Sequence, residues 1–360
     1  MIGTPPSGAH RRASALAELA PGLSLVRLRR LSVRDPLVRF PLAVGDRPLV
    51  SVGDVVMAGA PLAERMAEAT LVDVGSRAAL ADPAVGHAGT PGTGTSTARP
   101  WRSGTWVAAA DTPGGELVTH ADGRWRMAVG TAVDALEAPA AGVVREIRPG
   151  IALSFDVPGL ALLGIQSLGG PAHGRLEIAA TGDGEARPGA IDVGRAGTIL
   201  VFDARVDAET LSRARAMGVR GIVVAALSDK DGRDFASSEA RQRASLHRAA
   251  PFGVLVLDGH LRRPIAEPAL ALLRAHAGRQ VGIAADPPCL LFGAAPAELP
   301  ELDPVHVRIA HGPWAGREGR WEGLAGLRRF RAGAHLEAGR IRFDDGTAAV
   351  VPLADLERFA

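Results

Sequence analysis

The chain has 360 residues, of which 47% are hydrophobic and 22% are charged, and its formal net charge is +2. This composition is typical of a folded protein with several domains and excludes a disordered chain. Since no apolar run approaches the ~18 residues of a membrane span, we expect no membrane insertion. A single cysteine, Cys289, excludes an intrachain disulfide. Residues 1–30 lack the apolar core of a secretory signal, so we expect a cytoplasmic protein.

Several enzyme classes are excluded by missing motifs. Lys230 is the only lysine and follows no glycine-rich loop, so the chain has no Walker A site. The lysine and catalytic-loop motifs of protein kinases are also missing. No Gly-x-Gly-x-x-Gly follows an apolar strand, and the 10 histidines show no metal-ligand spacing. We therefore expect no cofactor and no metal.

The first half of the chain is predicted to be an N-terminal arm followed by a β domain. Residues 1–35 are rich in Pro, Ala and Arg and read as an arm, with a short helix expected over 12–20. Residues 36–190 show short apolar pairs separated by glycine turns, a pattern typical of short strands. Within them, 81–104 is a low-complexity segment that we expect to be a flexible insertion.

Two segments of this β domain carry a recognisable pattern. Residues 53–62 read Gly-Asp-Val-Val-Met-Ala-Gly-Ala-Pro-Leu, and residues 138–144 read Ala-Pro-Ala-Ala-Gly-Val-Val. Together, 40–65 and 135–165 resemble the barrel-sandwich hybrid of biotinyl/lipoyl-type domains, which implies that both segments share one domain. Carrier members of that family need a lysine at a hairpin tip, and neither segment has one. The resemblance therefore does not imply a carrier function.

Residues 191–295 are predicted to form an α/β domain with a parallel sheet. Continuous apolar runs alternate there with helical segments, a pattern typical of strands buried on both faces. The expected strands are 198–203, 221–227, 252–257 and 280–284, and the expected helices are 208–217, 237–248 and 266–276.

An acidic residue follows each of these four strands, and Asp229 is the one that follows residues 221–227. Asp203, Asp258 and Asp286 each stand at or just after the end of an apolar run. Ligands of parallel sheets bind outside the carboxyl ends of the strands, so these residues are a candidate ligand edge. The alternative is that each aspartate forms a turn or caps a helix, as aspartate commonly does after strands.

The last segment, 304–360, carries the most specific motif. A strand expected at 305–309 is followed by Gly312-Pro313-Trp314-Ala315-Gly316-Arg317-Glu318-Gly319, and Asp345-Gly346 predicts a later hairpin turn. The segment resembles the KOW domain of NusG-type transcription factors and some ribosomal proteins. The resemblance implies an independent, five-stranded SH3-like barrel that binds RNA or a transcription or translation protein and has no catalytic role.

Charge in this segment agrees with a nucleic-acid partner. Eight arginines stand between Arg308 and Arg342, against three acidic residues. Arginine contacts phosphates and aromatic rings stack on bases, so we expect partner contacts from this segment. The candidate residues are Trp314, Arg317 and, in an expected loop, Arg328, Arg329 and Arg331. The alternative is that Trp321 and Phe330 fill the barrel core and the arginines are a solvated face.

These observations predict a multi-domain protein with α/β and all-β parts. We expect a non-enzymatic scaffold or adaptor whose C-terminal KOW-like barrel binds RNA or a protein. The alternative is an enzyme, or an accessory subunit of an enzyme complex, with a small-molecule site at the carboxyl edge of the α/β sheet. No catalytic set is identified in the sequence.

Overall fold

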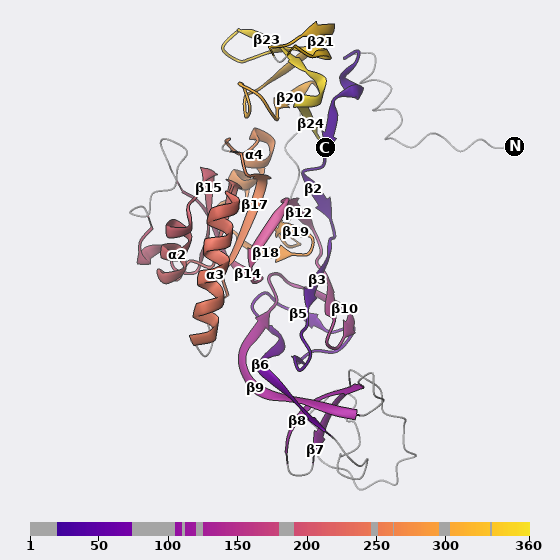
Figure 1. Cartoon of the computed structure of the whole chain (residues 1–360), viewed down its shortest axis with the longest axis vertical. Coiled ribbons are helices and arrows are strands. Elements are labelled where there is room, and N and C mark those ends of the chain that lie inside the picture. The colour runs from indigo at the N-terminus through magenta and orange to yellow at the C-terminus, as the bar shows by residue number, and fades with distance from the viewer. Residues whose placement is uncertain are drawn as a thin grey trace, which may run out of the picture.

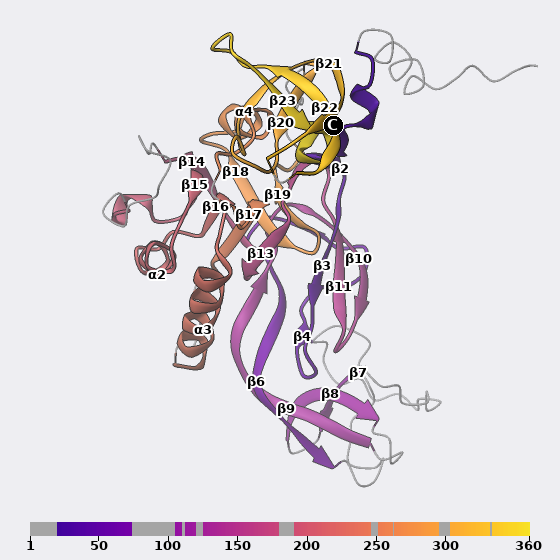
Figure 2. The ribbon, with the colours of Figure 1, turned by 45° about the horizontal axis from the view of Figure 1, so that its top comes forward.

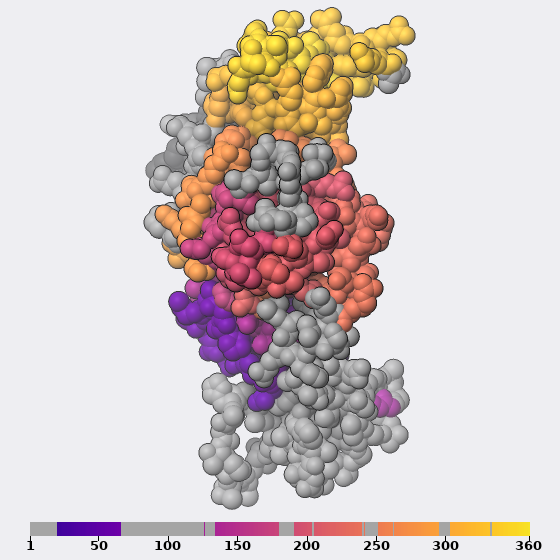
Figure 3. All heavy atoms as spheres, turned by 90° about the vertical axis from the view of Figure 1, so that its left-hand side faces the viewer, coloured from indigo at the N-terminus to yellow at the C-terminus, as the bar shows by residue number. Residues whose placement is uncertain are grey.

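The computed structural model describes residues 20–73, 105–109, 112–119, 125–179, 191–245, 251–261, 263–294, 303–331 and 333–360. Within these residues the protein is rich in strands, which form several sheets stacked along the long axis (Figure 1). The C-terminal part of the chain lies directly against its middle part (Figure 3). The insertion expected at 81–104 and, apart from Ala20, the helix expected at 12–20 lie outside the described residues.

The largest sheet has nine strands and lies at the centre of the molecule. Its strand order is β13-β17-β16-β15-β14-β18-β19-β12-β2. The bounds are β2 (Ser32–Arg34), β12 (Leu160–Leu163), β13 (Gln166–Gly169), β14 (Ala172–Ile178), β15 (Thr198–Arg205), β16 (Gly221–Ala226), β17 (Gly253–Gly259), β18 (Gln280–Ala285) and β19 (Pro288–Leu291). Strands β14 to β17 pair in parallel. Every residue of β16 and β17 is buried, which explains their continuous apolar sequences.

Three α-helices accompany this sheet in the described residues: α2 (Ala208–Ala216), α3 (Asp229–Ser245) and α4 (Glu267–Ala275). Helix α2 begins as its sequence predicts, because the Asp207 side chain accepts a hydrogen bond from the Thr210 amide. Helix α3 begins at Asp229, eight residues before the expected start. No described helix has the length and apolar character needed to cross a bilayer.

The last strand of the expected parallel series runs the other way. Strand β18 pairs antiparallel with β14, with Gln280 opposite Arg175 and Ile283 opposite Ala172. The turn after α4 places the start of β18 beside the middle of β14. Strand β18 then runs away from the edge of the sheet at which the parallel strands end. The expectation that residues 280–284 continue the parallel sheet is therefore wrong, and the end of β18 lies at the opposite edge.

The β segments before the central sheet form two smaller sheets. One has the order β3-β11-β10-β5, and the other β4-β6-β9-β8-β7. Their bounds are β3 (Leu37–Pro41), β4 (Arg47–Pro48), β5 (Val55–Val56), β6 (Pro61–Asp73), β7 (Thr105–Ala109), β8 (Thr112–Thr119), β9 (Trp125–Glu137), β10 (Gly142–Arg148) and β11 (Ala152–Asp156). Gly142 of β10 pairs with Val56 of β5, so the segments 40–65 and 135–165 are in contact.

This region does not end at residue 190 as a separate β domain. Strands β12, β13 and β14 belong to the central sheet. Phe40 and Phe155 share one buried cluster with Cys289 and Leu291 of β19. A continuous core therefore joins the smaller sheet to the central one.

The C-terminal sheet has six strands in the order β1-β24-β20-β21-β22-β23. Their bounds are β1 (Arg27–Arg29), β20 (His306–Ile309), β21 (Glu318–Arg329), β22 (His335–Arg342), β23 (Ala348–Pro352) and β24 (Leu356–Phe359). The described residues also form the 3-10 turns η1 (Leu23–Leu25), η4 (Val193–Arg195) and η5 (Leu353–Asp355). We use the name barrel for this six-stranded unit, although its outer strands β1 and β23 are not paired with each other in the described residues. Strands β21 and β22 run together beyond the rest of it (Figure 2).

The N-terminal segment is an integral part of the barrel. Strand β1 pairs in parallel with β24, and Leu23 and Val26 are buried in the same cluster as Trp321. The Trp321 Nε1 donates a hydrogen bond to the Pro21 carbonyl at 3.2 Å. Residues 20–35 are therefore not an arm, and β1 joins the five strands of residues 304–359 as a sixth. The sequence does not indicate the pairing of β1 with β24, because β1 contributes only three residues.

Candidate functional site

Charged residues from the barrel and the central sheet meet in a buried cluster. We call Arg29, Asp258, Arg263, Arg308 and Glu357 the seam cluster. Arg308 donates from Nη1 and Nη2 to the two carboxylate oxygens of Asp258, at 3.0 and 2.8 Å, and from Nε to Glu357 at 2.7 Å. Arg29 also contacts Asp258. Arg263 donates to the backbone carbonyls of Asp258 and Ala310, at 2.7 and 2.8 Å.

These contacts stabilise the charged forms of Asp258 and Arg308. Burial alone raises the pKa of Asp258, but the hydrogen bonds and charges of Arg308 and Arg29 outweigh it and hold the pKa below its usual value. Burial works against the charge of Arg308 too, yet Asp258 and Glu357 raise its pKa. The Arg308 side chain is fully buried and fully engaged. This geometry joins two units of the molecule and leaves Arg308 no role toward a ligand.

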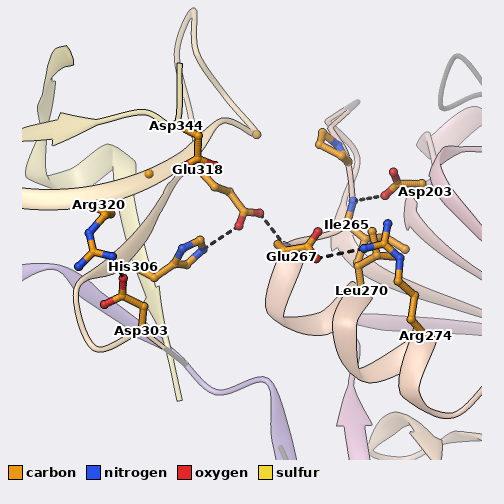
Figure 4. A pocket seen from close by; sticks show the side chains of 13 residues that line it. Asp203, Ile265, Glu267, Leu270, Arg274, Asp303, His306, Glu318, Arg320 and Asp344 are labelled. Carbon is orange, nitrogen blue, oxygen red and sulfur yellow. Dashed lines mark hydrogen bonds and ion pairs between the residues drawn. The ribbon is translucent and has the colours of Figure 1, made fainter. Parts of the chain in front are cut away.

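A cleft of about 550 Å³ also opens between the barrel and the central sheet (Figure 4). Its size falls in the ~300–1,000 Å³ range of small-molecule sites. One wall comes from β15 and α4, and the other from β20, β21 and the loops beside them. The lining residues are Asp203, Pro264, Ile265, Glu267, Leu270, Arg274, Asp303, His306, Gly316, Glu318, Gly319, Arg320 and Asp344.

Glu318 links the two walls of the cleft. Its Oε1 accepts a hydrogen bond from the Glu267 amide at 2.9 Å, and its Oε2 lies 2.7 Å from His306 Nε2. Glu267 is the first residue of α4, and the preceding Ala266 has no side chain able to cap the helix. A carboxylate from the barrel therefore caps the N-terminus of α4 and complements the helix dipole.

Most other charges of the cleft are paired within it. Arg274 lies 3.1 Å from Glu267, and Arg320 lies 2.5 Å from Asp303. Asp203 accepts the Ile265 amide at 3.1 Å but forms no ion pair with any described residue. Its pKa is raised, chiefly by burial. Asp344 is exposed and has no ion-pair or hydrogen-bond partner within the described ranges.

The three aspartates predicted at the ligand edge do not converge. Asp203 lines the cleft, whereas Asp258 accepts hydrogen bonds from Arg308 within the seam cluster. Asp286 follows β18 and lies at the opposite edge of the sheet, where its carbonyl accepts the Arg39 amide at 2.7 Å. The ligand edge therefore retains only Asp203, because Asp258 has arginine partners and β18 is antiparallel.

The barrel arginines divide between paired and unpaired groups. Arg317 lies 2.7 Å from Asp345 and stacks on the Phe343 ring at 3.7 Å, and Arg342 pairs with Glu322. By contrast, four exposed arginines form no ion pair with any residue that the structure describes: Arg328, Arg329, Arg331 and Arg340. We call residues 324–340, which carry these four, the arginine hairpin.

Two of the predicted contact arginines are on a strand. Arg328 and Arg329 are the last residues of β21, not part of a loop, and pair with Leu336 and His335 of β22. Arg331 follows at the turn. The structure thus brings together three of the five predicted contact residues.

The glycine-rich loop of the barrel faces a different neighbour. Trp314 on it is 42% exposed. Gly316 has φ +89°, and a Cβ there would lie 2.9 Å from the Cβ of Arg263. The loop therefore packs against Arg263 and Pro264, beside the seam cluster and between the central sheet and α4. Trp321 is buried in the barrel core, whereas Phe330 is only partly buried.

Other candidate chemistry is limited in the described residues. Cys289 is buried, and burial raises its pKa to about 12, so the thiol stays protonated at neutral pH. No group of three or more His, Cys, Asp or Glu side chains suited to a metal ion is present in the described part of the chain. No protein-family model, curated protein or solved structure matches the chain.

Most of the seam cluster has no signal in the sequence. Arg29 is 229 residues from Asp258, and Arg263 and Glu357 stand in segments with no motif. The sequence gives no signal at Arg308 either, because alternation along the strand places it on the face opposite Val307 and Ile309, a face that a polar residue usually exposes. In the structure both faces of this strand are buried at these residues.

Proposed function

We propose that this protein is a non-enzymatic, RNA-binding adaptor and that the arginine hairpin makes the RNA contact. The observation that carries the proposal is a set of four exposed arginines in one short segment, none of which forms an ion pair with a described residue. The segment 324–340 holds a single acidic residue, Glu337. Guanidinium groups without internal partners are available to phosphates, and releasing counterions from the nucleic acid favours their binding.

The strand register supports contact on both faces of the hairpin. Residues opposite each other across two strands project to the same face, and successive residues project to opposite faces. Arg328 is opposite Leu336, and the next pair is Arg329 with His335. Cationic groups thus occupy both faces, and the partly buried Phe330 next to the turn offers a ring for stacking on an unpaired base.

We also propose that the barrel is a KOW-type domain. Its support is the motif, the backbone at Gly312 and Gly316, which both have positive φ, and the antiparallel pairing of β20 to β23. The pairing of Gly142 with Val56 likewise supports the barrel-sandwich interpretation of the two smaller segments. The seam cluster would hold bound RNA in a fixed position relative to the central sheet, as a scaffold requires.

The test is a binding titration of the full chain with a fluorescent single-stranded RNA. The variant Arg328→Ser/Arg329→Ser/Arg331→Ser should bind at least tenfold more weakly, because each lost charged contact costs about 1 kcal/mol or more. The control Arg233→Ser/Arg241→Ser/Arg279→Ser removes the same charge from exposed positions of the central unit and should bind like the unaltered chain. Equal weakening by both variants, or no binding by the unaltered chain, would leave a protein as the partner of the barrel.

A further inference from the structure

We propose that the arginine hairpin binds RNA by entering the groove of a helical stem beside a bulge, so that both of its faces are covered at once. This inference rests on the RNA-binding function proposed above and names the class of RNA that the site takes. It is carried by the shape of the hairpin, by the side chains on each face and by the aromatic ring beside its turn.

The hairpin is a two-stranded ribbon with both faces open. Strands β21 and β22 pair as far as Arg329 and His335, beyond the rest of the barrel (Figure 2). The pairing continues to the turn, because the Phe330 amide donates a hydrogen bond to the Ala334 carbonyl at 2.9 Å. The last three residues of β21 and the first three of β22 are all exposed, so neither face is buried against another described element there.

Each face of this ribbon carries a cation and an exposed leucine. Residues opposite each other share a face, and successive residues alternate between faces. Arg328 and Leu336 therefore lie on one face, and Leu327 and Arg329 lie on the other. Leu327 is 61% exposed and Leu336 is 41% exposed. Because removing apolar surface from water is favourable, these leucines favour a partner that encloses the ribbon over one that covers a single face.

The groove of a nucleic-acid helix is a partner of this kind. Its two walls are phosphate backbones, so it brings anionic groups to both faces of an inserted ribbon. A two-stranded ribbon fits a groove of about 12 Å, the width of the major groove in B-form DNA, whereas the major groove of regular A-form RNA is too narrow. A bulge interrupts the stacking of an RNA stem and widens the groove beside it. A single strand has one backbone and reaches both faces only by bending around the hairpin.

Phe330 favours a bulged RNA stem over an uninterrupted duplex. It directly follows β21, shares the face of Arg328 by the same alternation and is only partly buried. The bases of a regular duplex are already stacked on one another, whereas a bulged base is free to stack on an aromatic ring. A bulged stem thus offers both a groove for the two arginine-bearing faces and an unpaired base for Phe330.

The experiment compares the affinity of the full chain for four fluorescent nucleic acids of one sequence, at about 0.15 M salt. They are an RNA stem with a short bulge, the same RNA stem without the bulge, one RNA strand alone and a regular DNA duplex. The bulged RNA stem should bind at least tenfold more tightly than each of the other three, because it alone supplies two backbones, an open groove and a free base.

Single substitutions separate the two faces from the ring. On the bulged stem, Arg328→Ser and Arg329→Ser should each lower the slope of log affinity against log salt by roughly 0.7–0.9, since each removes one phosphate contact from a different wall of the groove. Phe330→Leu keeps the charge and should leave the slope unchanged while reducing the preference for the bulged stem over the regular one. The control Arg233→Ser, at an exposed position of α3, should change neither quantity.

Each other outcome overturns the inference. It fails if the single strand, the regular RNA stem or the DNA duplex binds as tightly as the bulged stem, or if only one of the two arginine variants lowers the slope. Those results leave RNA binding by the hairpin intact, whereas binding to none of the RNAs would contradict the proposed function itself. Thermal melting checks that the variants are folded, and the exposed Arg328 and Arg329 carry the test should Phe330→Leu lower stability.

Discussion

The seam cluster and the arginine hairpin use the same residue type in opposite ways. In the seam, Arg308 is fully buried and bonded to Asp258 and Glu357. On the hairpin, Arg328 and Arg329 are exposed and have no ion-pair partner among the described residues. A buried charge that loses its partner is strongly destabilising, whereas an exposed one contributes little to stability. Arginine therefore joins two units of the molecule at the seam, whereas on the hairpin it is exposed and contributes little to the stability of the fold.

The largest expected effect is at the seam. Asp258→Asn removes the carboxylate that faces Arg308 and Arg29 and leaves buried guanidinium groups with one acidic partner. We expect unfolding in urea to show a loss of about 3–5 kcal/mol. The control Asp234→Asn, at an exposed position of α3, should change stability by less than about 0.5 kcal/mol. A loss below about 1 kcal/mol in Asp258→Asn would show that the seam cluster is not a stabilising link.

The same carboxylate gives the seam a defined pH dependence. The pKa of Asp258 in the folded protein lies below its ordinary value, because Arg308 and Arg29 outweigh the effect of burial. Its stabilisation is therefore complete above the unfolded pKa of ~3.9 and is lost as the pH falls through the folded pKa. The stability difference between the unaltered chain and Asp258→Asn should be constant from neutral pH to about 4 and shrink below it. A difference that grows in acid would contradict this assignment.

The next effect tests whether the N-terminal segment completes the barrel. Leu23 is fully buried in the cluster that contains Trp321, so Leu23→Ala should cost about 2–5 kcal/mol in urea unfolding. Leu25→Ala is a matched control, because Leu25 is 64% exposed. A fragment of residues 304–360 should show no dispersed amide spectrum by NMR, because it lacks Leu23 and β1. A folded spectrum from that fragment would restore the independent barrel that the sequence predicts.

A smaller effect is expected where the barrel caps α4. Glu318→Ala removes the acceptor for the Glu267 amide and the partner of His306. We expect a loss of about 1 kcal/mol, the usual cost of a lost N-cap. Glu337→Ala, at an exposed position of the hairpin, should be neutral. Equal stability of the two variants would mean that the cap does not contribute.

The smallest effect on stability is expected at the hairpin. Arg328→Ser/Arg329→Ser/Arg331→Ser should unfold within about 0.5 kcal/mol of the unaltered chain, because the three side chains are exposed and unpaired in the described structure. The measurement is again urea unfolding, under the conditions used for Asp258→Asn. A loss of several kcal/mol would mean that these arginines support the barrel and would remove the contrast with the seam.

Local signals predicted some elements well. The apolar runs of β16 and β17 and the Asp207 cap of α2 follow from side chains a few residues apart, and local patterns record such contacts. The direction of β18 depends on where the turn after α4 leaves the chain, which no local pattern encodes. The role of β1 depends on a partner more than 300 residues away, Glu357 being opposite Arg27.

The candidate sites also divide into those made of residues close in sequence, which the sequence predicts, and those made of distant residues, which it does not. The arginine hairpin was visible as a charge run, because its residues are neighbours in sequence. The cleft was visible only at Asp203, because its second wall comes from the barrel. Sequence spacing could not tell that Asp258 faces Arg308 or that Asp286 lies at the other edge of the sheet.

The salt dependence of RNA binding tests the proposed contact at the arginine hairpin. The affinity of the full chain for single-stranded RNA is measured at several salt concentrations, for the unaltered chain and for Arg328→Ser/Arg329→Ser/Arg331→Ser. Each phosphate contact contributes about 0.7 to the slope of log affinity against log salt, so losing three contacts should reduce the slope by about 2. Identical slopes for the two proteins would show that the arginine hairpin does not contact RNA and would contradict the proposed function.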